Sequence, residues 1–358
     1  MQTTPLNDEH VKLGASFTDF GGWSMPVRYG SDLDEHHSVR NSCGLFDISH
    51  MAEIRVQGND AASFLDYELI SKLSELAIGR AKYTMICNEQ GGVIDDLIVY
   101  RMAEDEFLIV ANAGNRKPVV AALTERQSKF SSLSVTDESD DWALIALQGP
   151  KAEGILSGLC GRDLSGEKYY SIVGARLGGV EVLLARTGYT GEDGFEVFVP
   201  APEAAKIWEL LLGQEGVSAC GLACRDTLRL EAGMPLYGHE LSLDVTPFDA
   251  GLGKVIRFDK GDFVGKAALE NAVPKKKLFG LKGEGRRAAR ADYEIYQPGA
   301  EAPVGIVTSG ALSPTLGYPV AMTYLIGEFE AGTQLEADVR GSRVPYEVVE
   351  LPFYKRKR

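Results

Sequence analysis

Regular alternation of apolar and polar residues begins at about residue 53 and predicts an α+β unit that extends to about residue 135. EIRVQG alternates as a strand does, and DAASFLDYEL has helical spacing, with Asp60 as its expected N-cap. Two runs joined by a Gly-Gly turn, YTMICN-EQGG-VIDDLIVYRM, predict a hairpin. A further strand, helix and strand are predicted at FLIVAN, NRKPVVAALTERQSKF and LSVTDES. This β-α-β-β-β-α-β order is typical of a ferredoxin-like module.

Beyond this unit the patterns change twice. WALIALQGP predicts a buried strand that ends in a Gly-Pro turn, and VEVLLART and FEVFVP predict strands that flank the loop GYTGEDGFE. Helices are expected at KAEGILSGL, APEAAKIWELLLG and GLACRDTLRLEAG, the last ending at Gly233. A Lys-, Arg- and Gly-rich stretch, PKKKLFGLKGEGRRAARAD, marks a boundary after about residue 270. The short β-like runs that follow predict a small all-β barrel.

Length and composition indicate a soluble, multidomain protein. The chain has 358 residues, of which 44% are hydrophobic and 25% charged, so two or three domains are expected. No run reaches the roughly 18 to 20 apolar residues of a membrane span, and the N-terminus MQTTPLNDEH lacks the pattern of a signal peptide. We therefore expect a cytoplasmic location. The net charge of −14 disfavours nucleic-acid binding, with the C-terminal KRKR as a local exception.

Cysteine and histidine give little sign of a metal or redox site. The five cysteines are an odd number and widely scattered, which argues against a disulfide framework. Cys220 and Cys224 are expected to be small core residues, because no His or third Cys lies near them. His36, His37 and His50 are expected to be structural or surface residues, and no metal site is predicted.

The loop GYTGEDGFE combines three glycines with three carboxylates, Glu192, Asp193 and Glu196. Such acids oppose a phosphate, and no GK[ST] follows, so a phosphate-binding loop is rejected. A metal site has weak support. Two interpretations stay open: a neutral heterocycle with adjacent N–H donors, such as a pterin edge held by a carboxylate fork, or a hairpin loop whose acids are solvated.

Charged pairs elsewhere also allow two interpretations. Asp95 and Asp96 enter a predicted strand, whose alternation sends them to opposite faces, so only one can address a given pocket. That carboxylate is either functional or part of an interdomain salt bridge. Arg225 and Arg229 are four residues apart on one predicted helix face, where pairing with Asp226 and Glu231 is the simpler explanation.

Eight stretches resemble, in order, those of the T-protein family of the glycine cleavage system, from about residue 5 to 356. They are GLFDISHM, NEQGGVIDDLIVY, ALQGPKA, TGYTGEDGFEV, GLACRDTLRLEAGMPLYG, DKGDFVGK, VTSGALSPTL and LPFYKR. The resemblance implies an α+β, three-domain cloverleaf with an inserted ferredoxin-like module and a C-terminal β-barrel. The implied domains are residues 1–52 with 136–270 for a folate-binding domain 1, 53–135 for domain 2 and 271–358 for domain 3.

The resemblance also implies a tetrahydrofolate-dependent aminomethyltransferase of glycine catabolism and one-carbon metabolism. Such an enzyme releases ammonia from the aminomethyl group carried on the lipoyl arm of H-protein. It passes the carbon to tetrahydrofolate as 5,10-methylene-tetrahydrofolate and leaves dihydrolipoyl H-protein. A monomer that meets H-protein only transiently is expected.

Functional residues are carried over by matching the family motifs to positions in this chain. The resemblance implies Asp96 as the catalytic aspartate, Glu196 as the pterin-binding glutamate with Tyr189 beside the ligand, and Arg225 as a folate contact. Tyr354 is expected near the glutamyl tail. Further channel-lining positions are Met51, Tyr83, Val110 and Asn112. One departure is Lys254, where many relatives carry an aromatic residue, which puts a stacking contact in doubt.

Three other activities fit the same resemblance less well. The first is a folate-dependent demethylase of a small methylated solute, such as dimethylsulfoniopropionate, and the second is that of the folate domains of dimethylglycine or sarcosine oxidases. The segments YTGEDGFE and RDTLRLEAG favour the T-protein family over both. The third is a non-catalytic folate-binding role in iron–sulfur assembly, but the K-G-C-Y-x-G-Q-E element of those proteins is replaced here by TGYTGEDG.

Overall fold

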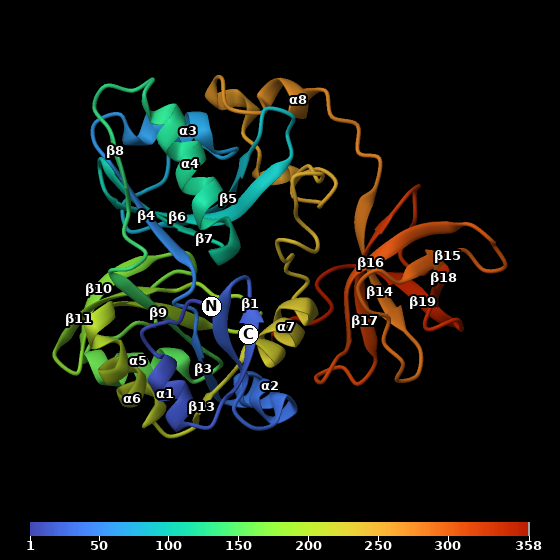
Figure 1. The fold of residues 1–358 in the computed structure, drawn as a ribbon, viewed down its shortest axis with the longest axis horizontal. Helices are drawn as coiled ribbons and strands as arrows, with labels where there is room; N and C mark the ends of the chain where they lie inside the picture. Colours follow the sequence, from blue (N-terminus) through green and yellow to red (C-terminus); the bar gives the residue numbers. More distant parts are fainter. Residues whose placement is uncertain (357–358) are drawn as a thin grey trace.

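The computed structural model describes residues 1–356, which form three lobes, each built on its own β-sheet (Figure 1). Two lobes are sheets covered by helices, and the third is a closed barrel reached by a long crossing segment. The predicted mixture of helices and sheets with a C-terminal barrel is therefore confirmed. The exact domain boundaries given above stay a prediction. None of the helices in residues 1–356 combines the length and apolar character that a membrane crossing needs.

The first lobe contains a six-stranded sheet that is antiparallel except where its last strand pairs in parallel. Its strands, in spatial order, are β10 (Ile172–Leu177), β11 (Val180–Ala185), β12 (Gly194–Pro200), β9 (Trp142–Gln148), β3 (Cys43–Asp47) and β13 (Val217–Ala219). The helices are α1 (Asn7–Lys12), α2 (Asp32–Asn41), α5 (Ala152–Cys160), α6 (Ala204–Leu212) and α7 (Leu222–Glu231). A two-stranded ribbon, β1 (Ser16–Phe20) with β2 (Trp23–Arg28), joins this lobe.

The second lobe is a five-stranded antiparallel sheet with two helices, in the predicted β-α-β-β-β-α-β order. In spatial order the strands are β5 (Ala81–Cys87), β6 (Val93–Ala103), β7 (Glu106–Ala111), β4 (Ala52–Gln57) and β8 (Ser134–Asp137). The helices are α3 (Ala61–Glu68) and α4 (Arg116–Gln127), which lie together over this sheet in Figure 1. The predicted N-cap position is confirmed, since Asp60 is the N-cap residue of α3, although its carboxylate accepts from the Ser131 and Ser132 N–H groups and not from the first turn of the helix.

The third lobe is a closed six-stranded barrel. Its strands, around the barrel, are β14 (Lys277–Gly283), β17 (Pro319–Leu325), β16 (Pro303–Leu312), β15 (Glu294–Tyr296), β18 (Gln334–Asp338) and β19 (Arg343–Val349). Strand β14 lies inside the Lys-, Arg- and Gly-rich stretch. That stretch therefore marks the domain boundary and also contributes a strand to the barrel. The crossing segment before it carries the short helix α8 (Lys266–Glu270).

Strands that are apolar on both faces hold the first two lobes together. Residues of β9 alternate between a core under the lobe's helices, with Ile145 and Leu147, and a second core that contains Leu144 and Ala146. The second core also receives Tyr100 and Val110 from the second lobe. A continuous apolar run in a strand is expected when both sheet faces are covered. The two sheets therefore face each other, and the space between them is where a cavity can form.

Helix α7 packs between the first lobe and the barrel (Figure 1). Leu228 belongs to the core shared by the first two lobes, whereas Leu230 packs on the barrel residues Ala311, Val320 and Met322. Residues two apart on a helix point in different directions, so one helix can contact both lobes. Side chains of α7 can therefore reach the centre of the molecule.

Candidate active site

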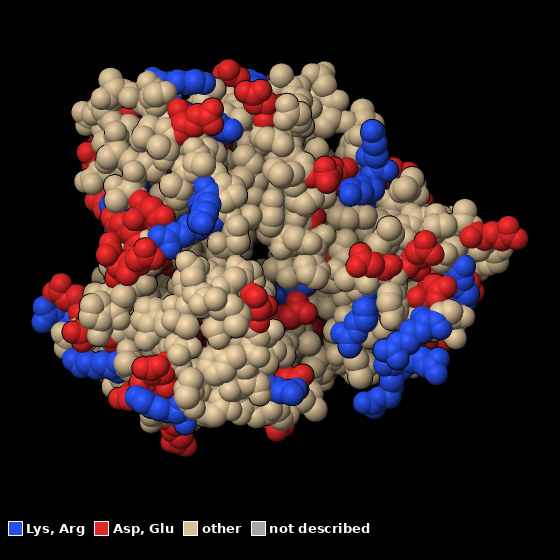
Figure 2. Space-filling model, viewed as in Figure 1, with Lys and Arg blue, Asp and Glu red and all other residues tan. Residues whose placement is uncertain are grey.

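A cavity of about 440 Å³ lies at the centre of the molecule, with walls from both sheets, α7, the β1–β2 turn and residues 233–237. The molecular surface is hollowed near the centre of the view, where the lobes meet (Figure 2). Eight of the nine site residues expected from sequence line the cavity: Met51, Tyr83, Asp96, Val110, Asn112, Tyr189, Glu196 and Arg225. These residues come from positions scattered over the first 225 residues of the chain, and folding brings them to one place.

Asp96 forms part of the cavity wall on strand β6. Its Oδ2 accepts a hydrogen bond of 3.0 Å from the Tyr83 hydroxyl, and its Oδ1 accepts one of 2.9 Å from Asn112 Nδ2. Burial raises the pKa of Asp96 above its ordinary value, although these two hydrogen bonds favour the ionised form. A carboxyl group with a raised pKa, held in a cavity, is suited to exchange a proton with a ligand.

Asp95 is fully buried and does not line the cavity, so alternation along β6 does expose only one of the two carboxylates to it. Neither Asp95 nor Asp96 takes part in an ion pair among residues 1–356, so the predicted alternative of an interdomain salt bridge is wrong. The partners of Asp95 are instead the amide groups of Asn112 and Asn115.

Glu196 lies on β12, on the wall of the cavity that the first lobe supplies. Its Oε2 accepts a hydrogen bond of 2.6 Å from Thr187 Oγ1 and a longer one of 3.4 Å from the Tyr100 hydroxyl. Burial raises the pKa of Glu196. Its other oxygen, Oε1, accepts no hydrogen bond from residues 1–356, so it is available to a ligand in the cavity.

Two arginines of α7, one turn apart, have different surroundings. Arg229 is buried and forms ion pairs with Asp226 and Glu240, both at 2.8–2.9 Å. Arg225 lines the cavity and lies over the Tyr189 ring, 4.9 Å from its centroid, and it joins none of the ion pairs among residues 1–356. Burial lowers the pKa of Arg225. Its guanidinium N–H groups are therefore free to meet acceptors of a ligand.

Comparison with family models and with known proteins agrees with this arrangement. Residues 6–260 match a model described as the GCVT N-terminal domain, and residues 276–355 match the glycine cleavage T-protein C-terminal barrel domain. An aminomethyltransferase of Saccharopolyspora erythraea is 54% identical over 361 residues, covering 99% of this chain and 98% of that protein. One of Desulfitobacterium hafniense is 42% identical, covering 100% and 99%.

A solved structure extends the similarity to three dimensions. The crystal structure of glycine cleavage system aminomethyltransferase T from Bartonella henselae has a TM-score of 0.93 and 37% identity, covering 99% of this chain and 98% of that one. The chain belongs to the glycine cleavage T-protein family. Membership makes it an aminomethyltransferase, and none of the other activities considered above is favoured by these comparisons.

The glycines of the loop GYTGEDGFE allow close packing inside this T-protein fold. A Cβ at Gly188 would lie 2.0 Å from Gln148 Oε1, although that atom ends a flexible side chain. A Cβ at Gly191 would lie 2.9 Å from the Ala232 Cβ, and Gly191 has a φ of +80°, which favours glycine. The Gln148 amide donates to the Thr187 carbonyl and accepts from Thr190 Oγ1. Hydrogen bonds of the Gln148 side chain therefore hold the loop against β9.

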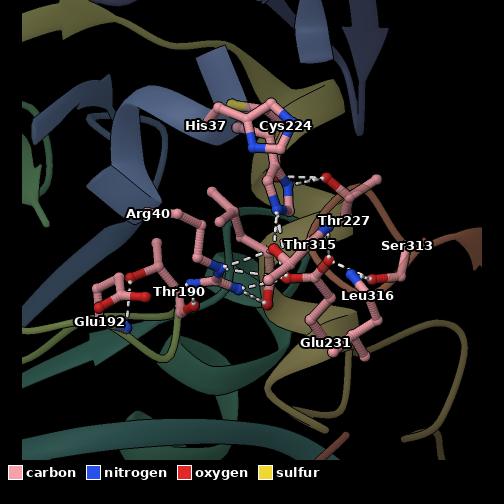
Figure 3. A network of polar contacts seen from close by, with 12 residues as sticks. His37, Arg40, Thr190, Glu192, Cys224, Thr227, Glu231, Ser313, Thr315 and Leu316 are labelled. Carbon is pink, nitrogen blue, oxygen red and sulfur yellow. Dashed lines mark hydrogen bonds and ion pairs between the residues drawn. The ribbon is translucent and has the colours of Figure 1, made fainter. Parts of the chain in front are cut away.

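The carboxylates of the same loop are not simply solvated. Glu192 is only 8% exposed and pairs with Arg40 at 2.9 Å, while Asp193 pairs with Arg186 at 2.6 Å (Figure 3 shows the first pair). The expectation of a solvated hairpin is therefore wrong for Glu192 and incomplete for Asp193. Sequence alone did not show the Glu192 pair because Arg40 lies 152 residues away from Glu192.

Tyr354 lies outside the cavity lining, unlike the other eight expected residues. Its ring covers the Arg40 guanidinium, 4.1 Å from the ring centroid, and its backbone N–H donates to the Glu231 carbonyl. Of the basic C-terminal segment, Arg356 approaches Asp193 at 3.4 Å, and residues 357–358 lie outside the described part of the chain. Lys254 is exposed and does not line the cavity.

A buried polar network around Glu231 joins the first lobe to the barrel (Figure 3). Glu231 accepts from the Arg40 guanidinium at 2.8 Å and from the Ser313 and Thr315 hydroxyls. The His36 ring bonds both Thr227 of α7 and Thr315 of the barrel. The expectation that His36 is structural is therefore confirmed, and Glu231 pairs with Arg40 instead of the suggested arginines of its own helix.

Replacing Arg40 with Ala is expected to lower the free energy of unfolding by about 3 to 5 kcal/mol, because two buried carboxylates would lose their partner. Chemical denaturation followed by tryptophan fluorescence measures this loss. Arg176→Ala is the matched control, since the Arg176–Glu181 pair is exposed and should contribute less than about 1 kcal/mol. Equal losses in the two variants would contradict a structural role for the network.

His50 is a cavity residue that sequence reasoning missed. It is 1% exposed, lines the cavity, and its Nδ1 has no hydrogen-bond partner among residues 1–356. Burial, with the nearby charge of Arg225 as the second cause, lowers the pKa of His50, so the ring is neutral at pH 7. Residues 233–237, Phe20 and Gly21 also line the cavity, and no periodic signal pointed to them.

Proposed function

We propose that the cavity binds tetrahydrofolate and that Asp96 acts on the transfer of a one-carbon unit from aminomethyl-lipoyl H-protein. The observation that carries the proposal is that Asp96 and Glu196, two carboxylates from different lobes, line one cavity. The match to the T-protein family supports the choice of co-substrate and partner.

Glu196 is proposed to recognise the pterin. A 2-amino-4-oxo pterin edge offers adjacent N–H donors, and a carboxylate accepts two such donors in a fork. Glu196 has a free Oε1, and Thr187 fixes the position of its Oε2. Tyr189 lies beside the ligand in this proposal, and the free guanidinium of Arg225 supplies donors to its acceptor groups. Met51, Val110 and the apolar part of the lining exclude water.

Asp96 is proposed to act where the carbon is received. The overall transfer breaks the bond from the carbon to the lipoyl sulfur and its bond to the amino nitrogen, and it forms two bonds to folate nitrogens. The two protons lost from those nitrogens leave with ammonia and with the thiol of dihydrolipoyl H-protein. Asp96, fixed by Tyr83 and Asn112, can hold one of these protons and stabilise positive charge on the transferred fragment.

Tyr354 is proposed to act from outside the cavity lining, near the glutamyl tail of the folate. We also propose that the enzyme is a cytoplasmic monomer and meets H-protein transiently. In Figure 2, Lys and Arg side chains gather on the barrel, while Asp and Glu are spread over all three lobes.

Incubation with aminomethyl-lipoyl H-protein and tetrahydrofolate tests the proposal, with ammonia and 5,10-methylene-tetrahydrofolate followed together. Equal amounts of the two products are expected. H-protein whose lipoyl arm lacks the aminomethyl group is the control and should give neither. If tetrahydrofolate binds but no product forms, the proposed function is wrong.

A further inference from the structure

Two neighbouring carboxylates share one amide group at the edge of the cavity. Asn112 Nδ2 lies 2.9 Å from Asp95 Oδ1 and 2.9 Å from Asp96 Oδ1. An amide NH₂ group has two N–H bonds, so it can donate one to each carboxylate at the same time. Asn112 follows β7 directly, and the register of β6 with β7, in which Ile98 pairs with Val110, places it opposite Asp96.

Asp95 accepts two further hydrogen bonds from the same turn. The Asn112 backbone N–H donates to its Oδ2 at 2.8 Å, and Asn115 Nδ2 donates to its Oδ1 at 2.5 Å. Asp95 is 0% exposed, and a buried carboxylate is costly unless such donors surround it. All of these donors belong to residues 112–115, so Asp95 fixes that turn where the β6–β7 ladder ends.

We propose that Asp95 is a positioning residue for this reaction, which orients the Asn112 amide so that it holds Asp96 toward the cavity. Asp95 itself does not line the cavity, and it acts only through Asn112. With Asp95 in place, one N–H of the amide is occupied and the other faces Asp96, whose Oδ1 lies 2.9 Å and whose backbone carbonyl oxygen lies 3.1 Å from Asn112 Nδ2. The inference rests on the proposed role of Asp96 in the transfer.

The electrostatic interaction between Asp95 and Asp96 supports this arrangement. Burial and the neighbouring charge of Asp96 raise the pKa of Asp95, while the amides of Asn112 and Asn115 oppose that rise. Two carboxylates this close repel each other unless donors lie between them. The shared amide supplies that separation, so the orientation of Asn112 affects the charge and the position of Asp96 together.

Asp95→Asn tests the proposal, because it keeps the shape but offers an NH₂ group to a turn made of donors. The expected result is a loss of about tenfold in kcat, since small displacements of a reacting group have effects of this order. The dissociation constant for tetrahydrofolate should change less than about twofold, because Asp95 does not touch the cavity. Wild-type kcat in a folded variant would overturn the proposal, and so would weaker folate binding with unchanged kcat.

Asp137→Asn is the matched control. Asp137 belongs to β8 of the same sheet, accepts hydrogen bonds from Ser139 and Arg116, and lies outside the cavity. The kcat of the Asp137→Asn variant is expected to equal that of the wild type. A loss as large as that of Asp95→Asn would show that any disturbed Asp of this sheet slows the enzyme, which overturns a specific role.

A double-mutant cycle with Asn112→Ala separates positioning from general support of the fold. If Asp95 acts through Asn112, the double variant has the kcat of Asn112→Ala alone. Losses that multiply would show that Asp95 acts independently of Asn112 and would overturn the proposal. A role in stability alone would lower the melting temperature and leave kcat of the folded enzyme unchanged.

Two further measurements keep the outcome clear. If Asp95→Asn does not fold, Asn115→Ala removes one donor to Asp95, and a kcat about threefold lower is expected; unchanged kcat there overturns the proposal. Asp96→Asn is assayed in parallel. Full activity of Asp96→Asn would reject the proposed function itself, whereas loss of activity in Asp96→Asn with wild-type kcat in Asp95→Asn rejects only the positioning role.

Discussion

Asp96→Asn is expected to lower kcat about a thousandfold, because it removes the one cavity carboxylate that is proposed to stabilise charge and hold a proton during the transfer. Tyr83 and Asn112 fix Asp96, so its replacement by an amide of the same shape changes charge more than geometry. Ammonia release at saturating H-protein and tetrahydrofolate measures kcat. The dissociation constant for tetrahydrofolate should change much less than kcat.

Asp95→Asn is the comparison variant for Asp96→Asn. Asp95 is buried and does not line the cavity, so its loss should slow the reaction far less. Comparable losses in the two variants would mean that the catalytic carboxylate has been assigned to the wrong residue. Thermal unfolding of both variants shows whether either loss reflects a damaged fold.

Glu196→Gln is expected to weaken tetrahydrofolate binding about 10- to 100-fold, because a charge-assisted hydrogen bond contributes roughly 1.5 to 3 kcal/mol. The amide keeps one acceptor oxygen but replaces the other by a donor, which opposes the N–H groups of the pterin. Titration of tetrahydrofolate, followed by quenching of protein fluorescence, measures the dissociation constant. At saturating folate the loss in kcat should be smaller than the loss in affinity.

Glu181→Gln is the control for the same β-sheet. Glu181 lies on β11, next to the strand that carries Glu196, and its side chain is exposed in a surface ion pair with Arg176. Folate affinity should not change in this variant. Unchanged affinity in Glu196→Gln as well would contradict the assignment of the pterin fork.

The element order of the second lobe could be predicted because each of its signals is local. The alternation in EIRVQG and VIDDLIVYRM and the helical spacing of DAASFLDYEL depend only on residues a few positions apart. The structure places β4, β6 and α3 at these segments. The hydrogen-bond partners of the Asp60 carboxylate could not be predicted in this way, because Ser131 and Ser132 follow it by 71 and 72 positions.

The cavity was predictable only in part. The resemblance to the family identifies eight residues that line it, whereas His50, which stands inside the motif GLFDISHM, is expected from sequence to be a structural or surface residue. Its place in the wall depends on packing against Phe20, whose ring meets the His50 ring at a centroid distance of 5.5 Å. The pattern of residues along the sequence does not predict that contact.

The sequence by itself determined the order of helices and strands in the second lobe, the family, and a small set of carboxylates to test. Tertiary structure alone decided the surroundings of each carboxylate. Arg40 neutralises Glu192, three amide donors surround Asp95, and Asp96 and Glu196 face the cavity. The physical reason is that the ionisation and role of a buried acid depend on its neighbours in space, which here come from strands and helices far apart in the chain.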